Sequence, residues 1–350
     1  MSFLDSRLHI SVPDTEMAIR FTPDPKSYVG KRILPMRPVR RKNDLIRQIN
    51  KANIIQKRDL RVGAKGRVAE VQFRLDQEQS FFTIDYAVSA IIDFGEAAQA
   101  DDALQYEQEQ LFVATEAMEV NVESIITEQT LRDTTVMTQN YTVGVAEYFN
   151  DYNATGDGPF RIIRNAIEST RIASGGKDPT SITMHRWTWS YLSEHPDLLG
   201  KAPVHTSPGG LQKISPDQFL QIFDLEPGKC ELNIVAGYYT SSNEGDPNPT
   251  YASYIGRDIV IAHTEQPALR TYGLGYTMAW AGPGQGGEPL KGADGNVLSQ
   301  VVYRIPLPDW GSHGGERIKV VGSFQAKILV PESGFLIKNA LDPALAKAYL

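Results

Sequence analysis

Residues 96–143 read EAAQADDALQYEQEQLFVATEAMEVNVESIITEQTLRDTTVMTQNYTV, the longest stretch of the chain without Gly or Pro. Apolar side chains recur in it at steps of three, four or seven, which places one narrow stripe along a helix. The stripe consists of Leu104, Leu111, Ala114, Met118, Val122, Ile125 and Ile126. Asp101 and Asp102 can cap the helix start, where backbone N–H groups lack partners. The pattern therefore predicts a helix over about residues 101–131, roughly 45 Å long, that other elements pack against.

The opposite side of this helix is acidic and is predicted to face solvent. It carries Glu107, Gln108, Glu109, Gln110, Glu116, Glu119 and Glu123. Beyond Leu131 the chain becomes rich in Thr, which favours a strand over a helix. Taken alone, the stretch is typical of a long helix in an α+β protein.

The overall composition is that of a globular protein. The chain has 350 residues, 41% of them hydrophobic and 22% charged, which allows one to three domains with ample core. No apolar run is long enough to span a bilayer, and the N-terminus lacks the pattern of a secretory signal. Cys230 is the only cysteine, so we expect a buried small residue, no disulfide within the chain and a cytosolic site of synthesis.

Charge is distributed very unevenly. Residues 31–74 contain 14 Lys/Arg and 3 Asp/Glu, a net of +11, so the rest of the chain carries −18 of the total −7. Such asymmetry predicts either a nucleic-acid surface or an arm that docks on an acidic surface. The basic segment has few of the interleaved aromatic rings that single-strand binders use. The acidic side of the long helix, on a second copy, is one candidate dock.

The segment before the long helix is predicted to be extended. Residues 1–27 contain Pro13, Pro23 and Pro25 and are expected to form an arm that lies on a surface. In residues 28–84, Pro35 and Pro38 exclude a helix in the first part and favour extended chain. Two strands are expected further on, Arg67–Leu75, whose apolar and polar residues alternate, and Ser80–Ile84. This two-stranded excursion has too little core to be stable alone, so we expect it to pack on a neighbour.

The second half of the chain mixes helices and strands. Helices are predicted over Pro159–Ala173, ended by Gly175 and Gly176, over His185–His195, stopped by Pro196, and after Ser215 as cap. Strands are predicted at Ser181–Met184, Leu232–Tyr239, Asp258–Ala262, Gly275–Trp280, Val301–Ile305, Ile318–Val330 and Phe335–Lys338.

Motifs that carry catalysis lack their required context. Gly282–Gly287 matches G-x-G-x-x-G, but Glu288-Pro289 follows where a phosphate-binding helix would have to begin. Ser174–Lys177 matches S-x-x-K without its partner motifs and fits a helix end. The six histidines show no metal-binding spacing. We therefore expect no catalytic residue, no metal site and no cofactor.

The order of these elements resembles the major capsid protein of tailed bacteriophages, whose fold is often called the Johnson fold. Residues 28–39, YVGKRILPMRPV, are similar to the segment that enters the family's extended loop. Residues 160–196 resemble the helix, turn, strand and helix that open its axial domain. Residues 255–262, IGRDIVIA, and 331–340, PESGFLIKNA, resemble its later strands and C-terminus.

The resemblance implies an α+β capsid fold with four regions. These are an N-terminal arm (1–27), an extended loop (28–84), a peripheral domain (85–150 and 312–331) built on the long helix, and an axial domain (151–311 and 332–350). It implies a structural protein, not an enzyme, that assembles with itself into hexamers and pentamers of an icosahedral shell enclosing double-stranded DNA. The expected location is the virion, after assembly in the host cytoplasm.

The implied partners are further copies of the chain, a portal, and packaged DNA bound non-specifically, without a membrane. Because only about 27 residues precede the loop, too few for a fused scaffold domain, we expect a separate scaffolding protein. Contacts between subunits are expected at Arg37, Arg40, Arg41, Lys42, Lys57, Arg58, Arg61, Glu107, Glu109 and Glu116. Two alternatives remain: an encapsulin-like compartment shell, and an α/β enzyme with its site in the loops within residues 241–295.

Overall fold

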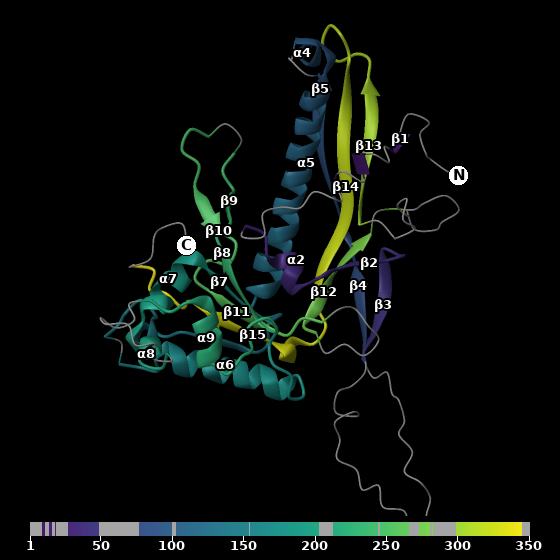
Figure 1. The fold of residues 1–350 in the computed structure, drawn as a ribbon. Coiled ribbons are helices and arrows are strands. Elements are labelled where there is room, and N and C mark those ends of the chain that lie inside the picture. The colour runs from purple at the N-terminus through teal and green to yellow at the C-terminus, as the bar shows by residue number, and fades with distance from the viewer. Residues whose placement is uncertain are drawn as a thin grey trace, which may run out of the picture.

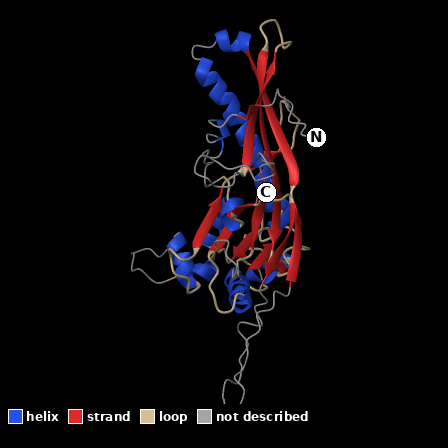
Figure 2. Ribbon diagram, turned by 90° about the vertical axis from the view of Figure 1, so that its right-hand side faces the viewer, coloured by secondary structure: helices blue, strands red, loops and turns tan. Residues whose placement is uncertain are grey.

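The computed structural model describes residues 9–10, 14–15, 18, 27–48, 77–99, 103–153, 155–202, 213–243, 246–265, 273–280, 282 and 299–344. One long helix and a set of long strands run side by side, and a second sheet covered by short helices lies at their lower end (Figure 1). The turned view shows the same long strands alongside the helix (Figure 2). The α+β fold class predicted from the sequence is confirmed.

The long helix predicted from the apolar stripe is present. Helix α5 (Ala103–Ile126) continues directly into a π-helical turn, η1 (Thr127–Leu131). The wider turn is visible in its bonds, since the Thr130 hydroxyl donates to the carbonyl of Ile125, five residues earlier (3.0 Å). The described members of the stripe are all buried: Leu111, Ala114, Met118, Val122, Ile125 and Ile126. The buried side of α5 packs against the long sheet.

The long sheet has six strands in the order β1-β13-β14-β12-β2, with β5 on the other side of β14. The sequence analysis assigned the predicted strands Gly275–Trp280 and Val301–Ile305 to the axial domain, but both segments pair with β14, the central strand of this sheet. The strands are β1 (His9–Ile10), β2 (Met36–Pro38), β5 (Ile84–Asp93), β12 (Gly275–Trp280), β13 (Gln300–Leu307) and β14 (Gly315–Ile328).

The second sheet has five strands in the order β6-β15-β11-β7-β8. They are β6 (Asn140–Thr142), β7 (Ser181–His185), β8 (Glu231–Val235), β11 (Ile259–Ala262) and β15 (Gly334–Lys338). Two hairpins stand apart from both sheets. Their strands are β3 (Asn43–Gln48) with β4 (Gln77–Phe82), and β9 (Tyr238–Thr240) with β10 (Tyr251–Ser253).

The remaining helices are short, apart from α6. They are α2 (Gly30–Ile33), α4 (Phe94–Gln99), α6 (Pro159–Ala173), α7 (Arg186–Glu194), α8 (Pro196–Leu199) and α9 (Pro216–Ile222), with single turns η2 (Val145–Glu147) and η4 (Pro331–Ser333). Helix α6 has the predicted bounds. Ser215 caps α9 in a capping box with Pro216 at its first position, as predicted. Pro196 ends α7 but also begins α8, a turn that the sequence did not predict.

The second sheet lies between two hydrophobic cores. Along β11, Val260 and Ala262 join the core that contains α5 and the long sheet, whereas Ile259 and Ile261 join the core under α6 to α9. All four residues are fully buried, as expected for a strand covered on both faces. The sheet therefore connects the long half of the molecule to its helical cover.

Two predictions about the first half of the chain were wrong. Residues 30–33 form a helix, although Pro35 and Pro38 were expected to exclude one. Glu119 and Glu123 were expected on the solvent side of α5, but their exposed fractions are 5% and 2%. The two errors have one cause, because these carboxylates hold the short helix.

Candidate assembly surfaces

Helix α2 fixes the start of the extended excursion to the side of α5. The N–H groups of Val29 and Gly30 donate to Oε1 of Glu123, at 2.9 and 2.8 Å. The buried carboxylate thus accepts hydrogen bonds at a helix N-terminus, where N–H groups lack partners within the helix. One residue further, Lys31 forms an ion pair with Glu119. Both acidic side chains therefore bind within the chain.

The environment of Glu123 is unusual for a carboxylate. Burial raises its pKa to about 7, although the hydrogen bonds from Val29 and Gly30 act in the opposite direction. The fit is also tight, since a Cβ at Gly30 would lie 2.8 Å from Oε2 of Glu123 and 2.9 Å from Cγ2 of Ile126. A glycine is therefore required for α2 to approach α5 this closely.

The same short helix contacts both sheets. Thr277 of β12 donates to the carbonyl of Leu34 (3.0 Å), and Thr264 donates to that of Ile33 (3.1 Å). Nη2 of Arg32 lies 2.5 Å from Oε2 of Glu231 on β8. The start of the excursion, at α2, is thus attached to α5, to the long sheet and to the second sheet.

Beyond α2, the chain forms the β3–β4 hairpin, which lies beside β12 (Figure 1). Its inner face packs Ile46 and Phe81 against residues of β12. Its outer face exposes Leu45 and Phe82, with exposed fractions of 52% and 56%. The base of the excursion therefore presents apolar area to solvent.

Four of the basic contact candidates lie at this base. Arg37 is near the ring of Tyr276, and Lys42 pairs with Asp85, whose pKa is lowered by hydrogen bonds from Lys42 and Ser323. Arg40 and Arg41 are exposed and form no ion pair with another residue in the described ranges. Lys57, Arg58 and Arg61 lie outside the described residues.

The acidic candidates on α5 divide into two groups. Glu109 and Glu116 are exposed, and Phe112 and Val113 between them are exposed by 38% and 63%. Steps of three and four place these residues on one side of the helix, which we call the outer stripe of α5 (Glu109, Phe112, Val113 and Glu116). Glu107 differs, because it accepts a hydrogen bond from Arg304 of the same chain (3.2 Å).

Arg304 also holds the N-terminal arm. It pairs with Asp14, and Nη1 lies 3.1 Å from Oε2 of Glu316. The pKa of Arg304 is raised, chiefly by its hydrogen bond to Asp14. The Thr15 hydroxyl accepts the N–H of Val302 (3.0 Å). The described part of the arm therefore lies along β13 of its own chain, where β1 forms the outermost strand of the long sheet. This is the kind of surface that the sequence predicted the arm to need.

The groups considered for catalysis have structural roles among the described residues. Cys230 is buried, which raises the pKa of its thiol to about 12 and keeps it protonated. Nδ1 of His185 and of His195 accepts the N–H two residues later, at 3.2 Å, and so caps α7 and α8. Burial lowers the pKa of His185 to about 4. Ser174 donates to the carbonyl of Lys177 (2.6 Å) at the end of α6, as a helix-end motif does.

The described part of the chain contains neither a candidate metal site nor a candidate membrane span. No group of three or more His, Cys, Asp or Glu there is placed to hold a metal ion. None of its helices combines the length and the apolar character needed to cross a membrane. Most of the Gly-rich loop at 281–295 lies outside the described ranges.

Sequence reasoning missed the roles of three residues that organise these surfaces. It placed Glu123 on the solvent side of the long helix, and it assigned no contact to Arg32 or Arg304. A partial signal existed for Glu123, since it follows Val122 of the apolar stripe and so borders the buried side of α5. Arg32 and Arg304 carry no local signal, because their partners lie far away in the chain.

Comparison with known proteins gave structural matches only. No family model matches the sequence, and no curated relative matches it. A phage-related protein from Bordetella bronchiseptica RB50 matches with a TM-score of 0.65 at 15% identity, over 97% of this chain and 99% of that chain. The SrpI encapsulin of Synechococcus elongatus PCC 7942 matches with 0.51 at 12%, over 91% and 89%. The capsid of Cyanophage P-SCSP1u matches with 0.50 at 10%, over 92% and 91%. The chain therefore has the phage capsid fold that the sequence resemblance predicted.

Proposed function

We propose that this chain is a shell-building subunit, the major capsid protein of a tailed bacteriophage. The observation that carries the proposal is the likeness of fold to a cyanophage capsid along nearly the whole of both chains. Self-association is the property this fold serves in both the capsid and the encapsulin. The role is structural, with no catalytic step assigned to any residue.

In this proposal, copies of the chain form hexamers and pentamers of an icosahedral shell that encloses double-stranded DNA. The shell assembles in the host cytoplasm with a separate scaffolding protein and a portal, and the protein resides in the virion. The body built on α5 and the long sheet, with β12 and β13 included, lines the wall. The second sheet and its helices form the axial domain around which capsomers close.

The basic excursion of one copy contacts the outer stripe of α5 in the next. Arg40 and Arg41 supply positive charge at its base, and Leu45 and Phe82 supply exposed apolar area. The outer stripe is complementary to this surface, because it has one carboxylate on each side of two apolar side chains. Such a contact joins different patches of identical subunits, and so closes into rings when the rotation allows. The pairing of opposite charges raises the rate at which two subunits meet and fixes how they align, and it adds less to the affinity between them.

A second candidate is a compartment shell of the encapsulin type, which the likeness to the SrpI encapsulin favours. It uses the same assembly surfaces but encloses protein cargo instead of a genome. DNA inside the particle, with a portal at one vertex, separates the phage capsid from this alternative.

The test is particle size, measured by negative-stain microscopy and light scattering on protein produced alone and together with the products of neighbouring genes. Closed shells, or free hexamers and pentamers, are expected in at least one condition. A monodisperse monomer in both conditions would contradict the proposed function.

A further inference from the structure

The second sheet ends in an open edge. Strand β8 is last in the order, paired on one side with β7, and no other described strand pairs with it. The N–H of Glu231 donates to the carbonyl of Thr180 next to β7 (2.9 Å). Because ladder bonds alternate along a strand, the N–H and C=O groups of Leu232 and Ile234 point away from β7. The edge thus offers backbone donors and acceptors to an incoming chain.

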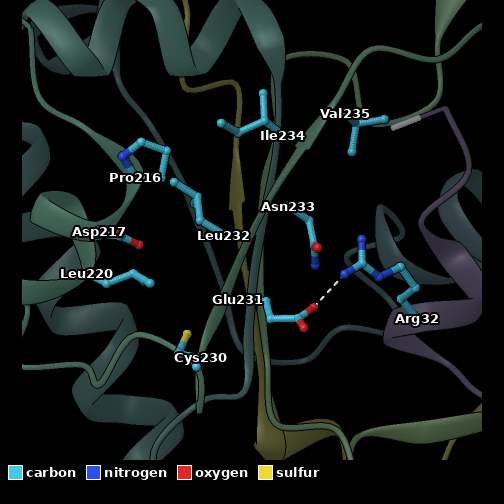
Figure 3. Close-up of a pocket in the computed structure, with 11 residues that line it drawn as sticks. Arg32, Pro216, Asp217, Leu220, Cys230, Glu231, Leu232, Asn233, Ile234 and Val235 are labelled. Atoms are coloured by element: carbon cyan, nitrogen blue, oxygen red, sulfur yellow. Dashed lines mark hydrogen bonds and ion pairs between the residues drawn. The ribbon is translucent and has the colours of Figure 1, made fainter. Parts of the chain in front are cut away.

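A groove of about 520 Å³ runs along this edge. It is lined by consecutive residues of β8 and by residues from two other elements, α9 and α2. Leu232 and Ile234 point toward the α9 side, where Pro216 and Leu220 lie, and Glu231 and Asn233 point toward Arg32 (Figure 3). The groove therefore has one largely apolar flank, which also contains Asp217, and one polar flank, with the backbone edge of β8 between them.

These flanks define the chemistry of an occupant. An extended segment that adds to β8 as a further strand would satisfy the backbone groups of Leu232 and Ile234. Its side chains would point alternately to the two flanks. The apolar side chains would face Leu220. The polar side chains would face the ion pair of Arg32 and Glu231, which provides one positively and one negatively charged partner. The occupant must therefore alternate apolar and polar residues.

We propose that the groove of one copy receives residues 69–75 of a second copy. In this segment Ala69, Val71, Phe73 and Leu75 alternate with Glu70, Gln72 and Arg74. The polar positions carry one negative and one positive charge, which matches Arg32 and Glu231. The inference rests on the proposed function and names the surface that this part of the excursion contacts.

The occupant is joined closely to the β3–β4 hairpin, which ends at the pair Gln48 and Gln77. Residues 49–76 lie outside the described ranges. Leu75 is two residues from Gln77 and Ala69 is eight, so they can lie at most about 7 Å and about 26 Å from it at 3.3 Å per residue. The contact therefore requires that the groove of the adjacent copy lie beside the end of this hairpin.

The experiment is a cross-link between two kinds of subunit assembled together, both carrying Cys230→Ser. One kind carries a cysteine in the segment, as Ala69→Cys, Val71→Cys or Phe73→Cys. The other carries Leu232→Cys or Ile234→Cys. A disulfide requires Cβ atoms about 4 Å apart, so oxidation of shells should give a covalent dimer for at least one pair. Ile172→Cys, on the exposed face of α6, replaces the β8 cysteine as the matched control and should give none.

The outcomes separate the inference from the proposed function. Shells that form normally but yield no dimer from any pair would overturn the inference and leave the proposed function intact. Failure of every preparation to form shells or capsomers would overturn both. A third preparation carries both cysteines on one chain. A disulfide within that chain, without any dimer between the two kinds of subunit, would make the contact internal and also overturn the inference.

A second variant tests the edge itself. Ile234→Pro removes an N–H that points into the groove, and proline is tolerated at such positions of an edge strand. We expect the folded subunit, checked by circular dichroism, to assemble at least about tenfold more slowly. Ile234→Val keeps the N–H and should assemble at the wild-type rate. Wild-type assembly by a folded proline variant would rule out pairing at this edge.

Discussion

Glu123 acts over a long distance in the chain. Its carboxylate accepts hydrogen bonds from N–H groups 93 and 94 residues away and so connects the last turn of α5 to the point where the excursion begins. A buried carboxylate is costly unless it is hydrogen-bonded. Here burial dominates, and the pKa of about 7 places its ionisation near neutral pH.

This gives a pH dependence of stability with a definite sign. The pKa of Glu123 is raised from 4.5 to about 7 on folding, so the folded state holds the proton more tightly than the unfolded state. Its contribution to the free energy of unfolding is fully present below pH 4.5 and is lost as pH rises through 7. The loss is on the order of 3 kcal/mol, since the pKa is raised by about 2.5 and each pKa unit corresponds to about 1.36 kcal/mol.

Urea unfolding of wild type and Glu123→Gln at pH 5 and pH 8 measures this contribution. The difference between the two proteins should change in favour of the variant as pH rises. Glu109→Gln, at an exposed position of the same helix, is the control and should follow wild type. A parallel pH profile for wild type and Glu123→Gln would contradict the assignment.

Gly30 provides a second test at the scale of one residue. Gly30→Ala places a Cβ 2.8 Å from Oε2 of Glu123, and such overpacking costs about 1–3 kcal/mol. Thermal unfolding should show a lower midpoint for this variant. Gly144→Ala is the matched control, because the nearest atom to its Cβ would be 3.7 Å away, and it should unfold like wild type. Equal midpoints for both variants would argue against close packing of α2 on α5.

At the scale of elements, α5 is the common support. The long sheet packs on it, α2 binds its buried carboxylates, and Glu107 joins the Arg304 network that holds the arm. At its far end, Nε of Arg132 lies 2.7 Å from Oδ2 of the buried Asp258, next to β11. The helix therefore has to be continuous from end to end for these contacts to form together.

Interrupting the helix should destabilise the whole molecule. Ala114 is buried in the middle of α5, and Ala114→Pro should cost about 3 kcal/mol or more in the free energy of unfolding. Ala114→Gly, which keeps the N–H, should cost about 1 kcal/mol. Chemical denaturation of the two variants provides the comparison. A proline variant as stable as wild type would exclude a continuous helix.

Elements with local signals could be predicted from the sequence, and elements held by distant partners could not. Helix α6 has an apolar stripe, Pro159 at its start and Gly175-Gly176 after its end, so its bounds follow from the sequence. Helix α2 has none of these. Pro35 restricts only the residue before it, which left residues 30–33 free to form a turn once Glu123 supplied the missing acceptor. The pairing of β12 and β13 with β14 is likewise non-local and has no signature in either segment.

The same division applies to the candidate surfaces. The sequence indicated the charge of the excursion and of α5, and Glu109 and Glu116 are indeed exposed. The sequence could not show that Glu119 and Glu123 are buried whereas these two residues are exposed. Charged residues that border an apolar stripe have the same local pattern whether or not a distant segment covers them. The groove beside β8 could not be predicted from the sequence either, because its flanks come from distant residues near positions 32, 216 and 232.

At the scale of the whole molecule, the charge pattern can be tested by reversal. Replacing Arg40, Arg41, Arg58 and Arg61 by Glu should lower the yield of closed shells at least about tenfold, because like charges would then face each other between subunits. The circular dichroism spectrum and unfolding midpoint should remain those of wild type, since Arg40 and Arg41 are exposed. Shell yield by light scattering is the measurement.

A compensating change sharpens this test. Adding Glu109→Lys and Glu116→Lys to the same chain restores opposite charges across the proposed contact, and should recover part of the yield. Salt should weaken assembly of the wild type, because exposed pairs are screened at about 10 Å in 0.1 M salt. Normal shells from the four-fold Glu variant would show that the excursion docks without its charges.

The order of strands in the long sheet also governs when a subunit becomes complete. His9 and Ile10 lie opposite Arg304 and Tyr303, and Ile84–Asp93 lies along β14. During synthesis these early segments have no partners until the last quarter of the chain has left the ribosome. The second sheet is also completed late, because β15 at 334–338 lies between β6 and β11. A nascent chain therefore has neither sheet complete until residues 334–338 have been synthesised.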